Sequence, residues 1–220
     1  MDRLAEKSSR YIPALSFQWL TPLYDPVLRW VMREETFKRA LVQQAGLKPG
    51  MQVLDLGCGT GTLTILVKQS APGVDVTGLD GDPEVLDIAR AKAAKAGLQI
   101  AWDAGMAFDL PYPDGKFDRV LASLVFHHLT RPDKQRAFYE AYRVLRPWGE
   151  LHMVDFGLAR TPLMRLAAVG MSRLEEAEDN FKGLLPVMMA SAGFTQVDEI
   201  AQFATLFGPL SLYSAVKPLR

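Results

Sequence analysis

The sequence is poor in cysteine: among its 220 residues there is one, Cys58. A single cysteine excludes an intrachain disulfide and leaves no cysteine cluster for zinc. An excess of charge of either sign is also missing, because Lys and Arg total 25 and Asp and Glu total 25. A balanced charge creates no overall field that favours nucleic acid or an anionic membrane. These absences predict a cytoplasmic protein that has no nucleic-acid partner.

Long hydrophobic runs are absent as well. No window offers about 18 apolar residues without charge, which is the minimum expected of a membrane span. The chain begins MDRLAEKSSR, which is charged and lacks the apolar core of a secretion signal. Hydrophobic residues nevertheless make up 49% of the chain, enough to bury one substantial core. We therefore expect one domain with additions.

The segment MQVLDLGCGTG, residues 51–61, is the most informative stretch of the sequence. Its apolar residues predict a short strand with Asp55 near the carboxyl end. Three glycines follow at every second position: Gly57, Gly59 and Gly61. Glycine lets the backbone turn, adopt positive φ and approach a ligand closely. Thr60 or Thr62 is then predicted to cap a helix whose free N–H groups point into the space beside the glycines.

The spacing of these glycines distinguishes between two classes of ligand. A dinucleotide fingerprint reads G-x-G-x-x-G and rests a pyrophosphate on the helix N-terminus. Here the third glycine comes one position early, and Asp55 would place a second anion beside the pyrophosphate. A carboxylate at this position suits a cationic group. The pattern disfavours an NAD-dependent oxidoreductase, which stays the alternative.

The motif VLDLGCGTG resembles the first motif of class I S-adenosylmethionine-dependent methyltransferases, in particular the type 11, ubiquinone/menaquinone-biosynthesis-like branch. The resemblance implies that Asp55 lies near the methionyl ammonium of S-adenosylmethionine and that Gly57, Cys58 and Gly59 lie against this cofactor. It also implies an α/β fold: a Rossmann-like, doubly wound, seven-stranded sheet of order 3-2-1-4-5-7-6 whose last strand is antiparallel.

A second landmark of that family follows in VDVTGLD, which predicts a strand ending at Asp80, 25 positions after Asp55. The resemblance implies that Asp80 accepts both ribose hydroxyls of the cofactor and that Gly81 lies beside them. A carboxylate can take two O–H donors at once. Asp82, followed by Pro83, is the better candidate for the cap of the next helix, which frees Asp80 for the ligand.

The third landmark departs from the family pattern. The resembled enzymes often read G-D-A-x-x-L-P-F, with the Asp accepting from the adenine amine. Alignment of LPY in this chain with LPF places Met106 and Ala107 where Asp-Ala is expected. We expect backbone groups of Met106 and Ala107 to read the adenine edge, with Asp103 as the alternative.

The predicted fourth strand, in FDRVLASLVFHHL, ends where open parallel sheets bind their ligands. Ser123 and Leu124 are predicted to line the cofactor. His127 and His128 follow, and the candidate role of either is to orient a substrate or to take its proton. The other interpretation is that one histidine packs under the next helix while the other faces solvent. Further on, RVLRPWGEL matches an architectural landmark of the family.

Residues 1–45 are predicted to form a helical lid ahead of a methyltransferase domain at 46–220, which carries a helical insertion near 157–192. Tyr24, in LTPLYDP, resembles a Y-D pair of the family whose tyrosine approaches the cofactor. The aromatic residues of this segment would otherwise pack against the outside of the domain. Peripheral membrane contact through residues 11–40 is a third possibility, weakened by prolines that interrupt the helix.

Together these features predict an S-adenosylmethionine-dependent methyltransferase. Its expected reaction is in-line transfer of a methyl group to an N, O or C nucleophile of a small or lipid-like molecule. No carboxylate cluster for a metal is found in the sequence. A cofactor-binding protein without turnover is a further alternative, and neither the methyl acceptor nor the oligomeric state can be inferred.

Overall fold

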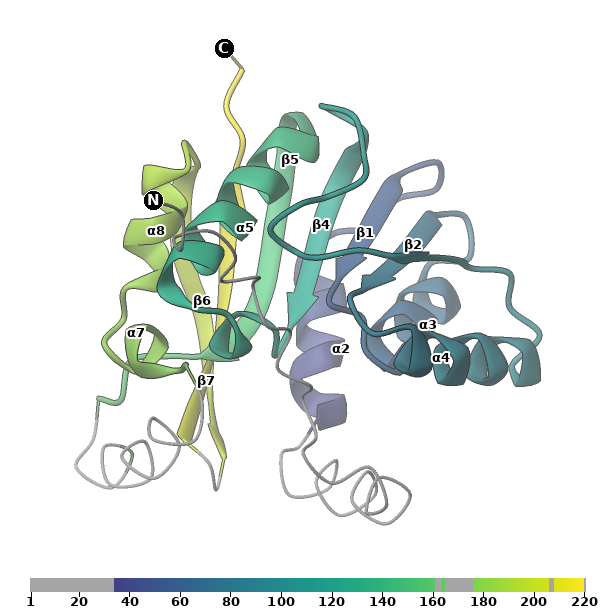
Figure 1. The fold of residues 1–220 in the computed structure, drawn as a ribbon, viewed down its shortest axis with the longest axis horizontal. Helices are drawn as coiled ribbons and strands as arrows, with labels where there is room; N and C mark the ends of the chain where they lie inside the picture. Colours follow the sequence, from purple (N-terminus) through teal and green to yellow (C-terminus); the bar gives the residue numbers. More distant parts are fainter. Residues whose placement is uncertain (1–33, 161–163, 165–175, 206–207, 220) are drawn as a thin grey trace, which may run out of the picture.

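The computed structural model describes residues 34–160, 164, 176–205 and 208–219 (Figure 1). In this part of the chain, seven strands form one sheet of order β3-β2-β1-β4-β5-β7-β6, which is the order that the resemblance implies. The strands are β1 (Gln52–Leu56), β2 (Asp75–Asp80), β3 (Ala101–Ala104), β4 (Phe117–Ser123), β5 (Leu145–Phe156), β6 (Thr195–Thr205) and β7 (Gly208–Val216).

Strand direction divides the sheet into two parts. Strands β3, β2, β1, β4 and β5 pair in parallel, whereas β7 runs antiparallel to both β5 and β6. The expected antiparallel last strand is thus confirmed. The carboxyl ends of the parallel strands meet at one edge of the sheet, at the bottom of the view in Figure 1. We call this edge the ligand edge, because open parallel sheets bind ligands there.

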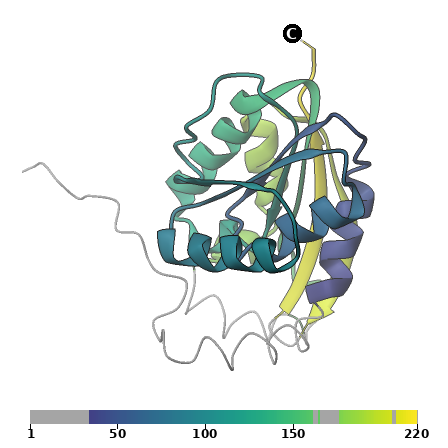
Figure 2. The ribbon, with the colours of Figure 1, turned by 90° about the vertical axis from the view of Figure 1, so that its right-hand side faces the viewer.

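Helices cover both faces of the sheet (Figure 2). One core packs α5 and α8 against the sheet, and a second core packs α2 and α3 against the opposite face. The described helices are α2 (Glu34–Gln44), α3 (Thr62–Ser70), α4 (Pro83–Lys95), the short 3-10 helix η2 (Phe126–His128), α5 (Arg131–Val144), α7 (Glu178–Phe181) and α8 (Leu185–Ser191). None of them is long and apolar enough to cross a membrane.

Helix α2 is the described part of the predicted N-terminal lid. Phe37 and Leu41 are fully buried, and the helix contacts α3 and β5. Residues 34–44 therefore belong to the core of the domain. Residues 1–33, with Tyr24 among them, lie outside the described residues.

The helix termini follow the sequence rules in one case and depart from them in another. Asp82 caps α4 by accepting from the Glu84 N–H over 2.9 Å, as predicted. The prediction that Thr60 or Thr62 caps α3 is wrong: Gly61 is the N-cap, at φ 77°, and makes no side-chain cap. Thr60 instead accepts a hydrogen bond from Lys92 over 2.7 Å, which directs its hydroxyl towards α4.

The stretch predicted as a helical insertion, 157–192, contains α7 and α8 in its described part. Met188 and Met189 of α8 are buried in the core shared with α5. Helix α7 contacts both η2 and β5. This contact brings α7 to the ligand edge.

Candidate functional site

The glycine loop after β1 adopts the backbone that its sequence predicts. Gly57, Gly59 and Gly61 have φ values of 67°, 52° and 77°. A Cβ atom on Gly57 would lie 2.6 Å from a methyl group of Val125, so glycine is required there by the loop after β4. A Cβ atom on Gly59 would meet nothing within 4 Å. The loop therefore lies closely against the protein at Gly57 and faces open space at Gly59.

Asp80, at the end of β2, is bonded to this loop. One carboxylate oxygen accepts from the Gly59 N–H over 2.8 Å, and the other accepts from the Asp82 N–H over 3.0 Å. Each oxygen can still accept a further hydrogen bond, because a carboxylate offers about four lone-pair sites. Burial raises the pKa of Asp80 in spite of these two donors. The geometry leaves Asp80 able to bind hydroxyl groups beside Gly59.

Asp55, the acid that precedes the glycines, is 1% exposed. One of its oxygens accepts from the Thr64 hydroxyl of α3 over 2.5 Å. Burial raises the pKa of Asp55 from 3.8 to about 6, and the Thr64 hydrogen bond and the charge of Lys38 only partly oppose this rise. Buried acids with raised pKa values are common in functional sites.

We expect Asp55→Asn to stabilise the ligand-free protein at neutral pH. The folded state disfavours the carboxylate, so the wild type loses stability as the pH rises from about 4 through about 6, by an amount on the order of 2–3 kcal/mol. The neutral amide avoids this loss. Thermal unfolding across that pH range should show the two proteins diverging as the pH rises; parallel curves would contradict the assignment.

The end of β4 carries two unusual residues. The Ser123 Oγ atom is buried, and no described residue hydrogen-bonds to it. Leu124 has φ 59°, a conformation that is unfavourable for a leucine, and its N–H donates to Val154 O over 2.9 Å. Unsatisfied buried polar atoms and strained backbone concentrate at ligand sites. Both residues were predicted to line the cofactor, and both lie at the ligand edge.

Met106 and Ala107, in the loop after β3, differ in how deeply they are buried. Met106 is half-buried and forms an isolated antiparallel bridge with Asp109, whereas Ala107 is buried in the core. Asp103, the alternative to them, accepts from the Tyr112 hydroxyl over 2.9 Å. Its carboxylate therefore has a partner inside the protein.

Cys58 lies within the glycine loop but has little access to solvent. It is 8% exposed, and its N–H donates to Leu79 O over 2.9 Å. Burial raises the pKa of its thiol, with Asp55 and Asp80 adding to the rise. The side chain is therefore an unreactive thiol packed beneath the loop.

Asp155, at the end of β5, was not among the predicted site residues. It is fully buried and accepts hydrogen bonds from five residues. These donors are the backbone N–H groups of Val125 (3.0 Å), Phe126 (2.7 Å) and Phe156 (2.8 Å), together with the side chains of His127 (2.9 Å) and Asn180 (2.9 Å). Burial alone would raise the pKa of Asp155, but His127 and the backbone donors outweigh it, and the pKa is lowered.

The two histidines occupy different environments. His127 is 6% exposed, with its ring centroid 4.0 Å from that of His128 and 4.9 Å from that of Phe156. His128 is half-buried. No three His, Cys, Asp or Glu side chains gather as a metal site in the part of the chain that the structure describes.

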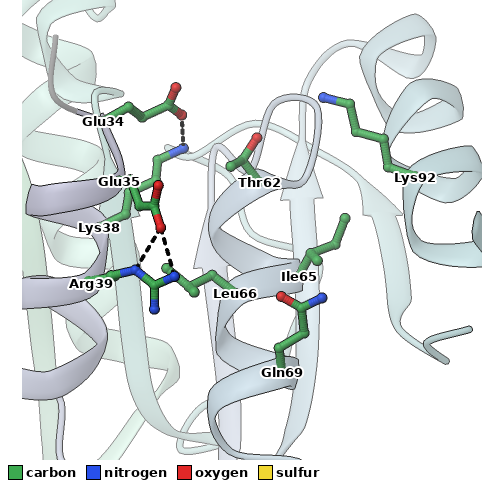
Figure 3. Close-up of a pocket in the computed structure, with 9 residues that line it drawn as sticks. All are labelled: Glu34, Glu35, Lys38, Arg39, Thr62, Ile65, Leu66, Gln69 and Lys92. Carbon is green, nitrogen blue, oxygen red and sulfur yellow. Dashed lines mark hydrogen bonds and ion pairs between the residues drawn. The ribbon is translucent and has the colours of Figure 1, made fainter. Parts of the chain in front are cut away.

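A groove of about 300 Å³ lies elsewhere, between α2 and α3 (Figure 3). Four of its charged side chains pair with one another, Lys38 with Glu34 over 2.5 Å and Arg39 with Glu35 over 2.7 Å. It is lined by Glu34, Glu35, Lys38, Arg39, Thr62, Ile65, Leu66, Gln69 and Lys92. The residues that line it do not include the glycines, Asp80 or the end of β4, although Thr62 directly follows Gly61 and Lys92 bonds to Thr60 of the glycine loop.

Several known proteins are similar to this chain in sequence or fold. An uncharacterised methyltransferase of Synechocystis is 33% identical over 169 residues, which cover 74% of this chain and 76% of the relative. The chain belongs to the methyltransferase family. The family described as "Methyltransferase domain" matches residues 53–149, from β1 through the turn into β5. The resemblance inferred from VLDLGCGTG is thus confirmed, and S-adenosylmethionine is the cofactor that membership implies.

A further relative and one solved structure are also similar to this chain. A demethylmenaquinone methyltransferase of Thermus thermophilus is 37% identical over 142 residues, and the chain spans 64% of its length, somewhat less than two thirds. A putative methyltransferase of Bacillus halodurans has a solved structure that shares the fold, with a TM-score of 0.67 at 23% identity over 83% of this chain and 99% of that one.

The residues at the ligand edge fit such a cofactor. Gly59 faces open space, Asp80 offers free lone pairs to hydroxyl groups, and Ser123 Oγ is a buried polar atom that lacks a partner among the described residues. These three features come from three neighbouring strand ends. Asp155 was missed as a site residue, although an acid at the end of a parallel strand is a signal that the sequence contains.

Proposed function

We propose that the protein catalyses transfer of a methyl group from S-adenosylmethionine to a nucleophilic N, O or C atom of a small or lipid-like molecule. The observation that carries the proposal is the contact between Gly59 and Asp80 at adjacent strand ends. The Gly59 N–H donates a hydrogen bond to the Asp80 carboxylate over 2.8 Å. Sequence spacing favours this ligand over a dinucleotide, and family membership supports it. A cytoplasmic location remains part of the proposal.

In this proposal the cofactor supplies a methyl group on a sulfonium, which an in-line nucleophile displaces. Asp80 and Gly81 bind the ribose, and the backbone of Met106 and Ala107 faces the adenine. Gly57, Cys58 and Gly59 lie against the methionyl part, which Ser123 and Leu124 also contact. The chain contributes mainly by holding the two reactants aligned and by excluding water.

Asp55 has a separate role in the proposal, as the acid that compensates the methionyl ammonium. A cation close to Asp55 would stabilise its carboxylate and lower its raised pKa. The free energy that the ligand-free fold loses by ionising this residue would then be recovered on binding. Tyr24 would complete the cofactor site from the segment outside the described residues.

The acceptor in this proposal is an apolar, quinone-like molecule. The names of two relatives support this, the demethylmenaquinone methyltransferase of Thermus thermophilus and a 2-phytyl-1,4-naphtoquinone methyltransferase of Synechococcus elongatus. Aromatic rings at the ligand edge suit such a molecule, with Phe156 and Phe181 5.1 Å apart. Incubation with tritiated S-adenosylmethionine and fractionated lipids tests the acceptor class; label found only in polar metabolites would contradict it.

Asp80→Ala should weaken binding of S-adenosylhomocysteine by roughly 1–3 kcal/mol, because two ligand hydroxyls lose their acceptor. Titration calorimetry measures the change. Asp87→Ala is the matched control, since Asp87 is an exposed acid of α4 that pairs with Arg90 on the outer surface. Equal affinities for all three proteins would remove the ribose assignment.

The same calorimetric measurement separates methyl-donor binding from dinucleotide binding. We expect the wild type to bind S-adenosylhomocysteine and to give no heat with NAD. Tight binding of S-adenosylhomocysteine without label transfer to any lipid or metabolite fraction would favour a binding protein without turnover. The reverse preference, for NAD, would overturn the proposed function.

A further inference from the structure

A second group of buried polar side chains lies at the ligand edge, apart from the glycine loop. It joins three elements, with His127 in η2, Asp155 at the end of β5 and Asn180 in α7. His127 Nδ1 and Asn180 Nδ2 both lie 2.9 Å from the same Asp155 oxygen. Asp155 and Asn180 are fully buried, so their geometry is fixed by packing as well as by hydrogen bonds.

The partners of Asp155 determine which nitrogen of His127 carries a proton. Five donors surround the Asp155 carboxylate, and its pKa is lowered, so it acts as an acceptor. Nδ1 of His127 must then donate to it. In a neutral imidazole the other nitrogen, Nε2, keeps a lone pair and can accept a proton. The arrangement matches the way an acid orients a catalytic histidine through the ring nitrogen that does not react.

Charged groups near this pair come from the neighbouring helices. Lys134 of α5 is buried and lies 3.7 Å from Asp179 of α7, and its charge also acts on Asp155. Arg131 pairs with the same Asp179. The ring of His128 covers one side of His127 at 4.0 Å. Ion pairs therefore connect α5 to α7 beside His127 and Asp155. In these pairs the two cations of α5 share the carboxylate of Asp179.

Two further polar oxygen atoms lie at this edge. The Oδ1 atom of Asn180 and the Oγ atom of Ser123 are buried, and neither has a hydrogen-bond partner among the described residues. Sites that present unpaired acceptors bind ligands that carry donors. Nearby, the rings of His127, Phe156 and Phe181 form a continuous series of contacts at 4.9 and 5.1 Å. This combination fits a flat aromatic ring that bears a hydroxyl group.

We propose that His127 is the proton acceptor for a methyl acceptor with an aromatic hydroxyl, and that Asp155 is the positioning residue that keeps Nε2 of His127 unprotonated. The inference rests on the proposed function and narrows its acceptor. The O–H bond of the acceptor breaks, and its proton passes to Nε2. The released electron pair, on oxygen or delocalised to a ring carbon, forms the bond to the methyl carbon. When a ring carbon takes the methyl group, its C–H proton then leaves to water, that electron pair restores the aromatic ring, and the oxygen regains a proton. The carbon–sulfur bond breaks with its pair on sulfur, and His127 later returns the proton to water.

Nitrogen NMR of the full chain tests the tautomer directly, with ¹⁵N-labelled histidine and saturating S-adenosylhomocysteine. The chain has 3 histidines, so His127→Gln and His128→Gln suffice to assign the spectrum. In the neutral form of the His127 ring we expect the proton on Nδ1. Addition of 1-naphthol should shift the Nε2 resonance of His127, because the hydroxyl donates to that atom.

Variants then separate the role of the pair from simple packing. His127→Gln should weaken 1-naphthol binding at least about tenfold. Asp155→Asn should shift part of the His127 signal to the Nε2–H form, because the amide nitrogen can donate to Nδ1. A neutral Nε2–H tautomer in the wild type, or an Nε2 signal that 1-naphthol does not move, overturns the inference. Calorimetry with S-adenosylhomocysteine on the same samples reports the proposed function separately, because cofactor binding does not depend on His127.

Discussion

Gly59→Leu is expected to abolish measurable binding of S-adenosylhomocysteine, with a loss of at least about a hundredfold, or roughly 3 kcal/mol. The reason is the open space that a Cβ atom on Gly59 would enter, which has no protein atom within 4 Å. In the proposed complex this space holds the cofactor against the backbone. A leucine side chain would occupy the same volume, and calorimetry or a thermal-shift titration would measure the effect.

Gly97→Leu is the matched control for this variant. Gly97 follows α4 and has φ 68°, and a Cβ atom there would also meet nothing within 4 Å. Both substitutions place leucine in the left-handed region, at a similar cost of about 1–2 kcal/mol in folding stability. Only Gly59→Leu should affect the ligand. If both variants bind equally well, the space beside Gly59 is not the cofactor site.

Asp155→Ala is expected to destabilise the fold by about 3–5 kcal/mol, the range found when one partner of a buried charged pair is removed. The carboxylate accepts from three backbone N–H groups and two side chains, all buried with it. Those donors would lose their partner inside the protein. The melting temperature should fall by roughly 10 °C for a chain of this size.

Asp198→Ala provides the reference for that measurement. Asp198 is an exposed acid of β6, and we expect its removal to change stability by less than about 0.5 kcal/mol. Chemical denaturation of both variants gives the two free energies. A loss at position 155 as small as that at position 198 would show that Asp155 does not organise the ligand edge.

The glycine loop could be predicted from sequence because its causes are local, whereas the strand order followed from the resemblance to a known family. A short apolar run, three glycines at alternate positions and an acid 25 positions later define β1, its loop and the end of β2. The cap at Asp82 was also predictable, since an Asp before a proline satisfies the first turn of a helix. In each case neighbouring residues supply both the signal and the structure.

The interactions that the sequence did not reveal join residues far apart in the chain. Asn180 reaches Asp155 across 25 positions, and Thr60 bonds to Lys92 across 32, which is why the predicted Thr60 cap was wrong. Leu124 adopts a positive φ that leucine rarely takes, because the loop after β4 must pass close to Gly57. Only the folded arrangement of several strands imposes these contacts.

Two loops at the ligand edge are fastened by acids that belong to neighbouring strands. Asp80 of β2 accepts from Gly59 in the loop after β1, and Asp155 of β5 accepts from Val125 and Phe126 in the loop after β4. In both cases the loop and the acid that binds it lie in different parts of the sequence. A chimera that takes the segment after β4 from a relative therefore also needs a compatible acceptor at position 155. Without it, the backbone N–H groups at positions 125 and 126 would have no partner in the protein.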